Sequence, residues 1–433
     1  MSAPSASGGH DPYIAFRSRV YRAYTIGWFI AMLGTRIQSV AIAWEMYQRT
    51  GDALSLGLVG LAQALPTMLL AIPAGYLADR FNRPKIVMLS LIMMTLTSAA
   101  LAVLSYLQGS VELMYLFLFL DAAAVILGRP ARVAMMPMLV PAASFPNAIM
   151  WNTSMSQFTS VLGPALGGLI VAWNVPAAYV ITALSSLIYF LMIYRLELPP
   201  DVKPVGGASF KTLVAGMQFV WNTRIIFTML SLDMFGVLLG GAVYLLPIFA
   251  EDILQVGAEG FGWLRAAPAI GAFVLGVGMV YLPPMQRAGR TLLVCVAAFG
   301  AATVIFGLSK SFWLSFAMLA LTGAFDTVSM VIRQTLVQLL TPDEMRGRVS
   351  AVNSIFVGAS NELGGLESGL MAHWFGPIFS VVSGGIGTIL VVLGAAWLSP
   401  ELRRYGPLAA PGTALPVPAK PLATAAPVGA ADD

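Results

Sequence analysis

Long apolar stretches separated by short polar loops dominate the pattern of this chain. Roughly 20 consecutive apolar residues cross a bilayer as a helix, and Gly or Pro inside such a helix is tolerated. Twelve stretches are of about this length: 22–48, 54–78, 86–107, 113–139, 146–172, 177–195, 225–250, 258–282, 291–308, 312–339, 349–372 and 376–398. The pattern therefore predicts an all-α integral membrane protein with twelve transmembrane helices.

Composition and charge support this interpretation. The chain is 58% hydrophobic and 10% charged, whereas a soluble domain has about 25% charged residues. Lys and Arg gather in the loops of one side, for example Arg80, Arg83 and Lys85, while the other side carries Arg49 and Lys310. Because cytoplasmic loops are richer in Lys and Arg, we expect both termini in the cytoplasm and the chain in the plasma (inner) membrane. The net charge of +4 follows from this bias and implies no nucleic-acid partner.

The order of the stretches predicts two pseudo-repeated six-helix bundles. An offset of 201 residues places Arg132 on Arg333, Asn152 on Asn353 and Gly168 on Gly369. Bundles repeated in the same membrane orientation pack with a site between them. The expected segments are a cytoplasmic N-terminal segment (1–16), a first bundle (17–195), a cytoplasmic linker with an amphipathic helix (196–224), a second bundle (225–400) and a disordered Pro/Ala-rich cytoplasmic tail (401–433).

Residues suited to cofactor or metal chemistry are sparse. The single cysteine, Cys295, lies in an apolar stretch, and His10 and His373 are far apart. A structural zinc site needs clustered Cys and His ligands, and an ATP-driven pump needs a GxxxxGK[ST] loop. We therefore expect no metal, no cofactor and no enzymatic activity. An integral-membrane enzyme and a non-transporting receptor remain as alternatives.

Two local motifs carry more information. The loop 75–85 contains Gly75, Asp79, Arg80 and Arg83 between two spans. We favour a charge latch that holds the cytoplasmic side closed, because an acid among basic residues needs a partner. The alternative is a tight turn whose basic residues only set topology.

The second motif is a glycine cluster inside the fifth span. It comprises Gly163, Pro164, Gly167 and Gly168. Small residues let membrane helices approach closely, and Pro permits a bend. A generic packing face is the alternative to a specialised role.

Both motifs resemble those of the major facilitator superfamily. Loop 75–85 looks like its signature between spans two and three, with Asn82 where Gly is usual and Pro84 before Lys85. The glycine cluster looks like the fifth-span motif of proton-coupled antiporters, with Thr159 in place of the leading Gly. The stretches 129–134, 341–348 and 360–364 are similar to the branch holding enterobactin exporters and macrolide-efflux-like proteins.

This resemblance covers about residues 15–400 and implies specific roles. It implies that Asp79 faces Arg132 and the segment beginning at Arg346 when the cytoplasmic side is closed. It also implies that the fifth-span motif belongs to an antiporter, and therefore favours export.

Charges deep in the membrane cost about 2.5–3.5 kcal/mol each on insertion scales and persist when paired or wet. The expected cavity or proton-coupling residues are Arg36, Asp121, Asp326, Arg333, Glu362 and Glu367. Asp121 either forms a static pair with Arg36 or faces a cavity. Arg333 could hold one acid ionised. Proton carriage needs a carboxylate that alternates between charged and neutral forms, and Asp121 and Asp326 are the first choices, ahead of Glu362.

These expectations combine into one functional hypothesis. The chain is expected to be a secondary active exporter of an amphipathic small molecule, such as a siderophore, macrolide or other drug, by alternating access in exchange for protons. The partners are then the substrate, protons and the lipid bilayer, and we expect a monomer. The alternative transporter is a proton-coupled importer of a small organic nutrient.

Overall fold

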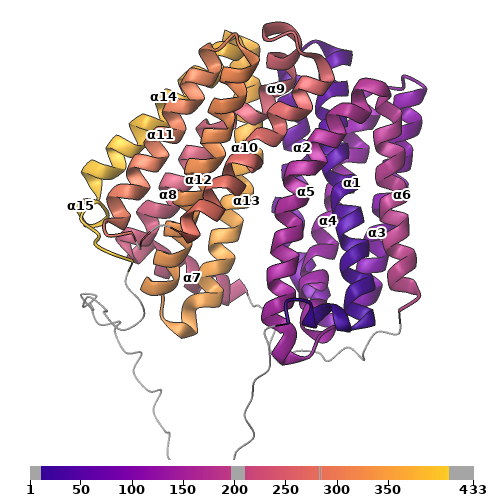
Figure 1. Cartoon of the computed structure of the whole chain (residues 1–433), viewed down its shortest axis with the longest axis horizontal. Coiled ribbons are helices and arrows are strands. Elements are labelled where there is room, and N and C mark those ends of the chain that lie inside the picture. The colour runs from indigo at the N-terminus through magenta and orange to yellow at the C-terminus, as the bar shows by residue number, and fades with distance from the viewer. Residues whose placement is uncertain (1–10, 197–209, 282, 284, 409–433) are drawn as a thin grey trace, which may run out of the picture.

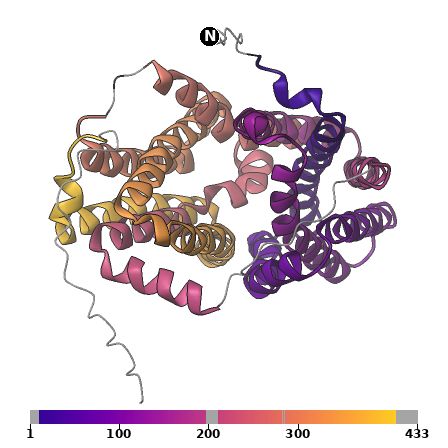
Figure 2. The same cartoon turned by 90° about the horizontal axis from the view of Figure 1, so that it is seen from below.

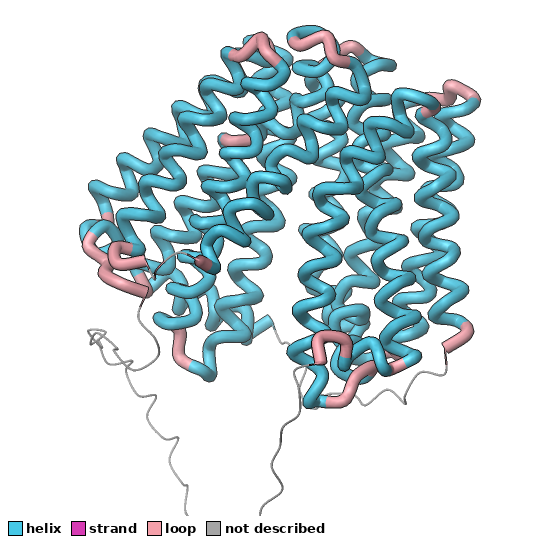
Figure 3. Tube along the Cα trace, in the orientation of Figure 1, coloured by secondary structure: helices cyan, strands magenta, loops and turns pink. Residues whose placement is uncertain are grey.

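The computed structural model describes residues 11–196, 210–281, 283 and 285–408. Across these residues the regular secondary structure is helical, without strands (Figure 3). The first half contains α1 (Arg19–Thr50), α2 (Ala53–Arg80), α3 (Arg83–Tyr106), α4 (Val111–Met135), α5 (Phe145–Trp173) and α6 (Val175–Tyr194), with short 3-10 turns η1 (Ile14–Arg17), η2 (Met136–Met138) and η3 (Ala142–Ser144).

The second half begins with α7 (Phe210–Asn222). There follow α8 (Arg224–Leu239), η4 (Gly241–Leu245), α9 (Leu246–Ile248), the π-helical turn η5 (Phe249–Ile253), α10 (Gly257–Val280), α11 (Ala288–Leu308), α12 (Phe312–Leu340), α13 (Asp343–Phe375), α14 (Pro377–Leu398) and α15 (Pro400–Arg403). The expected seventh span, 225–250, is thus a broken helix that runs from α8 to η5.

Polar residues in the short loops start several of these helices. The Asn82 side chain accepts a hydrogen bond from the backbone N–H of Lys85 at 3.1 Å, and Asn174 does the same for Ala177 at 3.0 Å. Both Asn residues satisfy a donor that the first helical turn leaves open, and a Pro follows each in that turn, as Pro84 does in α3. Asn82 in the loop 75–85 is therefore the N-cap of α3.

The helices form two bundles that stand side by side (Figures 1 and 2). One bundle contains α1–α6 and the other α8–α14. The bottom of Figure 1, where α7 and both ends of the described chain lie, is called the lower end, and the top is called the upper end. Between the bundles, α2 packs against α13 and α5 against α10.

The bundles share a core at the upper end only. One apolar cluster includes Val40 and Trp44 of α1 together with Phe249 and Phe261 of the second half, and the rings of Trp44 and Phe261 stack at 5.7 Å. Two further clusters each belong to a single bundle. Figure 1 shows the ribbons diverging toward the lower end. The upper ends are thus packed together, while the lower ends have separate cores.

Eleven stretches of the described chain are long and apolar enough to cross a membrane, with α8 to η5 counted as one. The remaining expected span, 349–372, lies within α13, whose polar side chains lower its hydropathy. α13 packs against α2, α8, α7 and α14. Because it lies among other helices, its polar residues need not face lipid. The twelve-helix, two-bundle fold is confirmed.

Two expected segments lie partly outside the described residues. Of the linker 196–224, residues 197–209 are not described, and the expected amphipathic helix corresponds to α7. The expected start of the disordered tail, residue 401, is too early in the chain. Leu402 is fully buried, and the backbone N–H groups of Ala288 and Leu408 donate to Gly406 and Met285, each at 3.1 Å. These hydrogen bonds hold residues 401–408 against the start of α11, and 409–433 lie outside the description.

Candidate functional site

Two glycine–glycine crossings join the bundles at the upper end. A Cβ on Gly168 of α5 would lie 2.6 Å from the Cα of Gly262 on α10, and a Cβ on Gly369 of α13 would lie 2.6 Å from the Cα of Gly57 on α2. Real Cβ atoms do not approach this closely, so only glycine allows these helices to touch along their backbones. Both crossings pair a helix of one bundle with a helix of the other.

The fifth-span motif divides its glycines between two contacts. A Cβ on Gly163 would lie 2.3 Å from the Cβ of Arg36, and a Cβ on Gly167 would lie 3.0 Å from the Cβ of Val40; both neighbours are on α1. Gly168 instead faces α10, and the carbonyl of Pro164 lies 2.7 Å from a Cβ placed on Gly262. The motif therefore holds α5 against its own bundle and against the other one.

Polar contacts also cross between the bundles at the upper end. His373 Nδ1 near the end of α13 lies 2.8 Å from Asp52 Oδ1, which precedes α2. The Tyr47 hydroxyl of α1 donates to Asp252 of η5. Together with the glycine crossings, these contacts close the upper end.

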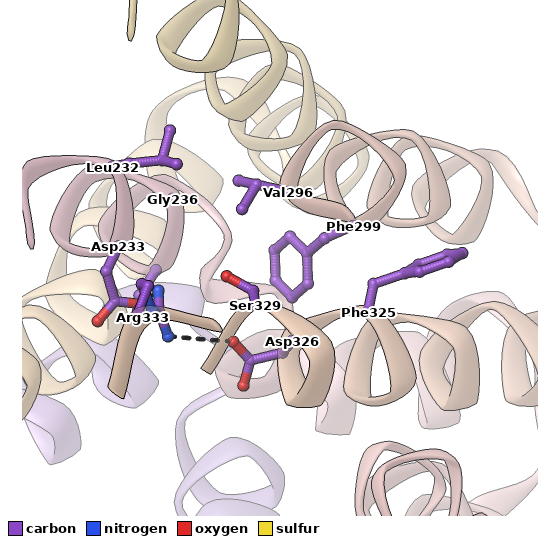
Figure 4. A pocket seen from close by; sticks show the side chains of 10 residues that line it. Leu232, Asp233, Gly236, Val296, Phe299, Phe325, Asp326, Ser329 and Arg333 are labelled. Carbon is purple, nitrogen blue, oxygen red and sulfur yellow. Dashed lines mark hydrogen bonds and ion pairs between the residues drawn. The ribbon is translucent and has the colours of Figure 1, made fainter. Parts of the chain in front are cut away.

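A buried ion cluster lies in the second bundle, between α8 and α12. Arg333 forms an ion pair with Asp233, whose side chain is 7% exposed, and its Nη2 lies 3.7 Å from Asp326 Oδ1, whose side chain is 51% exposed. Figure 4 shows Arg333 between the two acids, with Ser329 and Phe299 beside them. The adjoining cavity measures about 20 Å³, enough for about one water molecule.

Asp233 was not among the expected site residues. Its sequence signal was an acidic residue within an expected membrane span. The sequence did not identify a basic residue as its partner. Arg333 pairs most closely with Asp233, which leaves Asp326 as the more accessible and less tightly paired carboxylate.

Asp121 lies inside the first bundle and is 8% exposed. Its oxygens accept hydrogen bonds from Thr97 Oγ1 at 2.8 Å and Gln38 Nε2 at 3.3 Å, and Ser98 in turn donates to Gln38 at 2.7 Å. Arg36 forms no ion pair with it among the described contacts, so of the two alternatives the static Arg36–Asp121 pair is wrong for this structure. Arg36 lies two residues before Gln38 on α1 and packs against Gly163 of α5. The hydrogen-bond partners of Asp121 are therefore neutral.

The two remaining acids are on α13. Glu367 is half-buried, and Ser368 Oγ donates to it at 3.4 Å. The side chain of Glu362 lies outside the described part of the structure. Neither position can be ranked above Asp326 on its contacts.

Sequence reasoning missed a buried pair at the upper end of α1. Glu45 is 5% exposed. It pairs with Arg49 Nη2 at 2.5 Å and accepts from Tyr179 Oη at 2.7 Å, while Arg49 Nη1 donates to the carbonyl of Gly109 at 2.8 Å. The i,i+4 spacing of Glu45 and Arg49 was the available signal, and the pair ties α1 to α6 and to the α3–α4 loop.

The expected latch residues lie at the lower end, and the printed ion pair and hydrogen bond of Arg346 and Arg80 stay within their own helices. Arg346 pairs with Asp343 of its own helix at 2.8 Å, and Arg80 binds Tyr76 on α2. Asp79 forms no ion pair with Arg132 or Arg346 among the described contacts. A Cβ on Gly75 would meet no atom within 4 Å, so close packing does not require glycine here. The latch stays a prediction for a state in which the lower ends meet.

Asp79→Asn tests the latch. Export should fall severalfold, since an exposed ion pair contributes about 0.2–1 kcal/mol and each 1.4 kcal/mol is about tenfold in rate. Arg132→Ala should have a similar effect, and membrane insertion should be unchanged because Arg83 and Lys85 remain. The measurement is the export rate per inserted molecule. An unchanged rate in Asp79→Asn would show that this acid belongs to a tight turn and has no role in closing the cytoplasmic side.

Two pseudo-repeated helical bundles, closed at one end by backbone-to-backbone crossings, define a transporter of the major facilitator superfamily. The sequence matches the family described as transmembrane secretion effector over residues 10–410, and the chain belongs to that family. It is a membrane transporter of the efflux type and not an enzyme. Among the described residues, no group of His, Cys, Asp or Glu could hold a metal ion.

Relatives and solved structures agree with this assignment. The chain is 26% identical over 396 residues to enterobactin exporter EntS from Shigella flexneri and from Shigella boydii, covering 89% of this chain and 93% of each relative. A bacterial homologue of the lysosomal transporter Spinster, inward-facing and occupied, aligns with a TM-score of 0.71 at 16% identity over 91% of this chain and 99% of that one. A peptide transporter POT variant aligns with a TM-score of 0.72 at 12% identity over 92% and 99%. The structural likenesses concern the fold alone.

Proposed function

We propose that this protein exports an amphipathic small organic molecule of the siderophore, macrolide or drug class, in exchange for protons. The observation that carries the proposal is the match to relatives named enterobactin exporters along 93% of their length. The membership of a secretion family supports the same direction. In this proposal the protein works as a monomer, since each chain contains both bundles.

The proposal places the lower end in the cytoplasm. Basic residues of the lower loops, including Arg80, Arg83 and Arg346, outnumber those of the upper loops, where Arg49 is paired with Glu45. Cytoplasmic loops have this excess of Lys and Arg. The structure then has its outer side closed and its two lower cores separate, which is the inward-open state of an alternating-access cycle.

Asp326 is the proposed proton carrier. It combines a half-exposed carboxylate with a cation 3.7 Å away, whereas Asp233 is buried and already paired with Arg333. When Asp326 takes up a proton, its attraction to Arg333 is lost and Asp233 keeps the guanidinium. Asp326 can therefore alternate between charged and neutral forms without leaving an unpaired buried cation, which would be costly.

Accumulation in intact cells tests the direction of transport. Cells that express the protein should accumulate less of a labelled siderophore or macrolide than cells without it, because export opposes entry. A protonophore should remove the difference, since it dissipates the gradient that drives exchange. Greater accumulation in expressing cells, abolished by the same protonophore, would overturn export and make the protein a proton-coupled importer.

A further inference from the structure

The contact between Asp52 and His373 is built from the ends of three helices. α1 ends at Gly51 in a left-handed conformation (φ 63°), which only glycine adopts readily. The turn leaves Asp52 as the N-cap of α2, where its Oδ1 accepts from the backbone N–H of Leu54 at 3.0 Å. His373 lies in the last turn of α13, just before Gly376. A loop of the first bundle thus meets a helix end of the second.

His373 lies beside two sources of negative charge. The carbonyl end of a helix carries partial negative charge, which attracts a cation, and Asp52 adds a full negative charge 2.8 Å away. An imidazole changes its charge between about pH 5 and pH 8. The side chains of His373 and Asp52 are 42% and 40% exposed, so protons from the surrounding water reach them.

Arg49 and Asp252 near this contact have partners of their own, whereas Glu251 and Glu112 add negative charge. On the elements beside Asp52, Arg49 pairs with Glu45, and Tyr47 binds Asp252 of η5, where Glu251 precedes it. Tyr115 of α4 donates to the carbonyl of Ser55. Its neighbour Glu112 begins the same helix and adds negative charge.

Of the described elements packed on α13, α14 and η4 carry no charged side chain. Next to it, α14 (Pro377–Leu398) contains no titratable residue. Tyr244 of η4 lies against Gly365, two turns earlier on α13, and Glu367 of α13 itself is bonded to Ser368. Asp52 is therefore the acid that responds to the charge of His373.

Asp52 stays ionised over the range in which an imidazole titrates. Burial opposes its charge, but the hydrogen bonds from His373 and from Leu54 N–H outweigh burial and lower the pKa of Asp52. A carboxylate with a lowered pKa stabilises the contact above its ordinary pKa of about 4 and loses that effect as the pH falls below it. An ion pair between the two groups therefore exists whenever the imidazole carries its proton and the carboxylate is ionised.

We propose that Asp52 and His373 form a lock on the outer side of the transporter that tightens when the external medium is acidic. Protonation of His373 turns a hydrogen bond between the bundles into an ion pair. The closed outer side is thereby favoured, and outward opening is slowed as external pH falls from about 8 to 5. This inference rests on the proposed alternating-access cycle and on the assignment of the upper end to the outside, but not on the substrate or on proton exchange.

The lock lies about one helical turn from a glycine crossing. It therefore acts at the place where α2 and α13 separate when the outer side opens. Gly57 of α2 touches Gly369 of α13 along their backbones, and Asp52 and His373 are each within five residues of these positions. Opening the outer side separates α2 from α13 and must break the Asp52–His373 contact. A partly exposed pair of this kind should change the ratio of closed to open protein by about two- to five-fold.

Distance measurements between spin labels test the lock without any substrate. Labels on Leu107→Cys and Lys310→Cys, both exposed at the upper end of opposite bundles, in a Cys295→Ser background, report the closed fraction in purified, reconstituted protein. The labelled protein with Asp52 and His373 intact should show a larger closed fraction at pH 5.5 than at pH 7.5. His373→Gln should remove that dependence on pH, and Asp52→Asn should do the same.

A variant that retains the positive charge at position 373 distinguishes loss of the lock from misfolding. His373→Arg carries its charge at every pH tested, so its closed fraction should be high and equal at pH 5.5 and pH 7.5. A closed fraction that does not change with pH when Asp52 and His373 are intact would overturn the proposal. A pH dependence that survives His373→Gln would also overturn it, and would assign the effect to another group such as Asp326. Because no substrate is present, neither result depends on whether the protein exports or imports.

Discussion

Replacing Gly262 with Ala is expected to reduce transport by about five-fold to a hundred-fold. A Cβ at this position would lie 2.6 Å from the Cα of Gly168 and 2.7 Å from the carbonyl oxygen of Pro164. Both neighbours are backbone, which cannot rotate away, so α10 and α5 must move apart. Inserting a carbon into a tight contact costs about 1–3 kcal/mol, and each 1.4 kcal/mol changes a rate or population about tenfold. This free energy destabilises the state in which the upper end is closed, so the transport cycle is slowed.

The same substitution elsewhere on α10 supplies the control. A Cβ on Gly278 would meet no atom within 4 Å, so Gly278→Ala should transport at the normal rate and insert equally well. The measurement is the initial rate of export per molecule in the membrane for both variants. Equal rates for Gly262→Ala and Gly278→Ala would show that the crossing with Gly168 is not needed for closure.

Asp326→Asn should abolish export driven by a pH gradient while substrate counterflow persists. Asn resembles the protonated carboxyl group in shape and charge, so Arg333 keeps its pair with Asp233 and the bundle remains intact. Counterflow exchanges substrate for substrate and needs no net proton movement. Gradient-driven export and counterflow are measured side by side in vesicles that contain equal amounts of protein.

Asp121→Asn separates coupling from stability. Asp121 is 8% exposed and bonded to Thr97 and Gln38 inside the first bundle, so the variant should insert less well but keep its response to the gradient. If Asp326→Asn retains gradient-driven export while Asp121→Asn loses it, the carrier is in the first bundle. If both variants, together with Glu362→Gln and Glu367→Gln, retain it, coupling to protons through a carboxylate is wrong.

Much of the fold could be predicted from the sequence, because apolar length alone identifies a membrane helix. Length and hydropathy do not reveal interruptions, and the span 225–250 is broken into α8, η4, α9 and η5. The tail boundary at 401 was wrong because one buried side chain, Leu402, and a few backbone hydrogen bonds leave no periodic signal.

The candidate site could be predicted only in part. Spacing along a helix shows which residues share a face, but not which neighbouring helix that face meets. A static pair of Asp121 and Arg36 was therefore one of two alternatives, yet their side chains contact different helices. The glycines of the fifth span were recognisable as a close-packing motif, while their division between α1 and α10 depends on contacts between distant segments.

Uptake into everted membrane vesicles with an imposed pH gradient tests the central claim most directly. With the lower end in the cytoplasm, as proposed, that end faces the bath in such vesicles, and export would carry a labelled siderophore or macrolide into the lumen. We predict that vesicles with an acidic lumen accumulate the compound, that vesicles without the protein do not, and that collapsing the gradient stops uptake. Accumulation that instead requires an acidic bath, or that is the same with and without a gradient, would contradict proton-driven export.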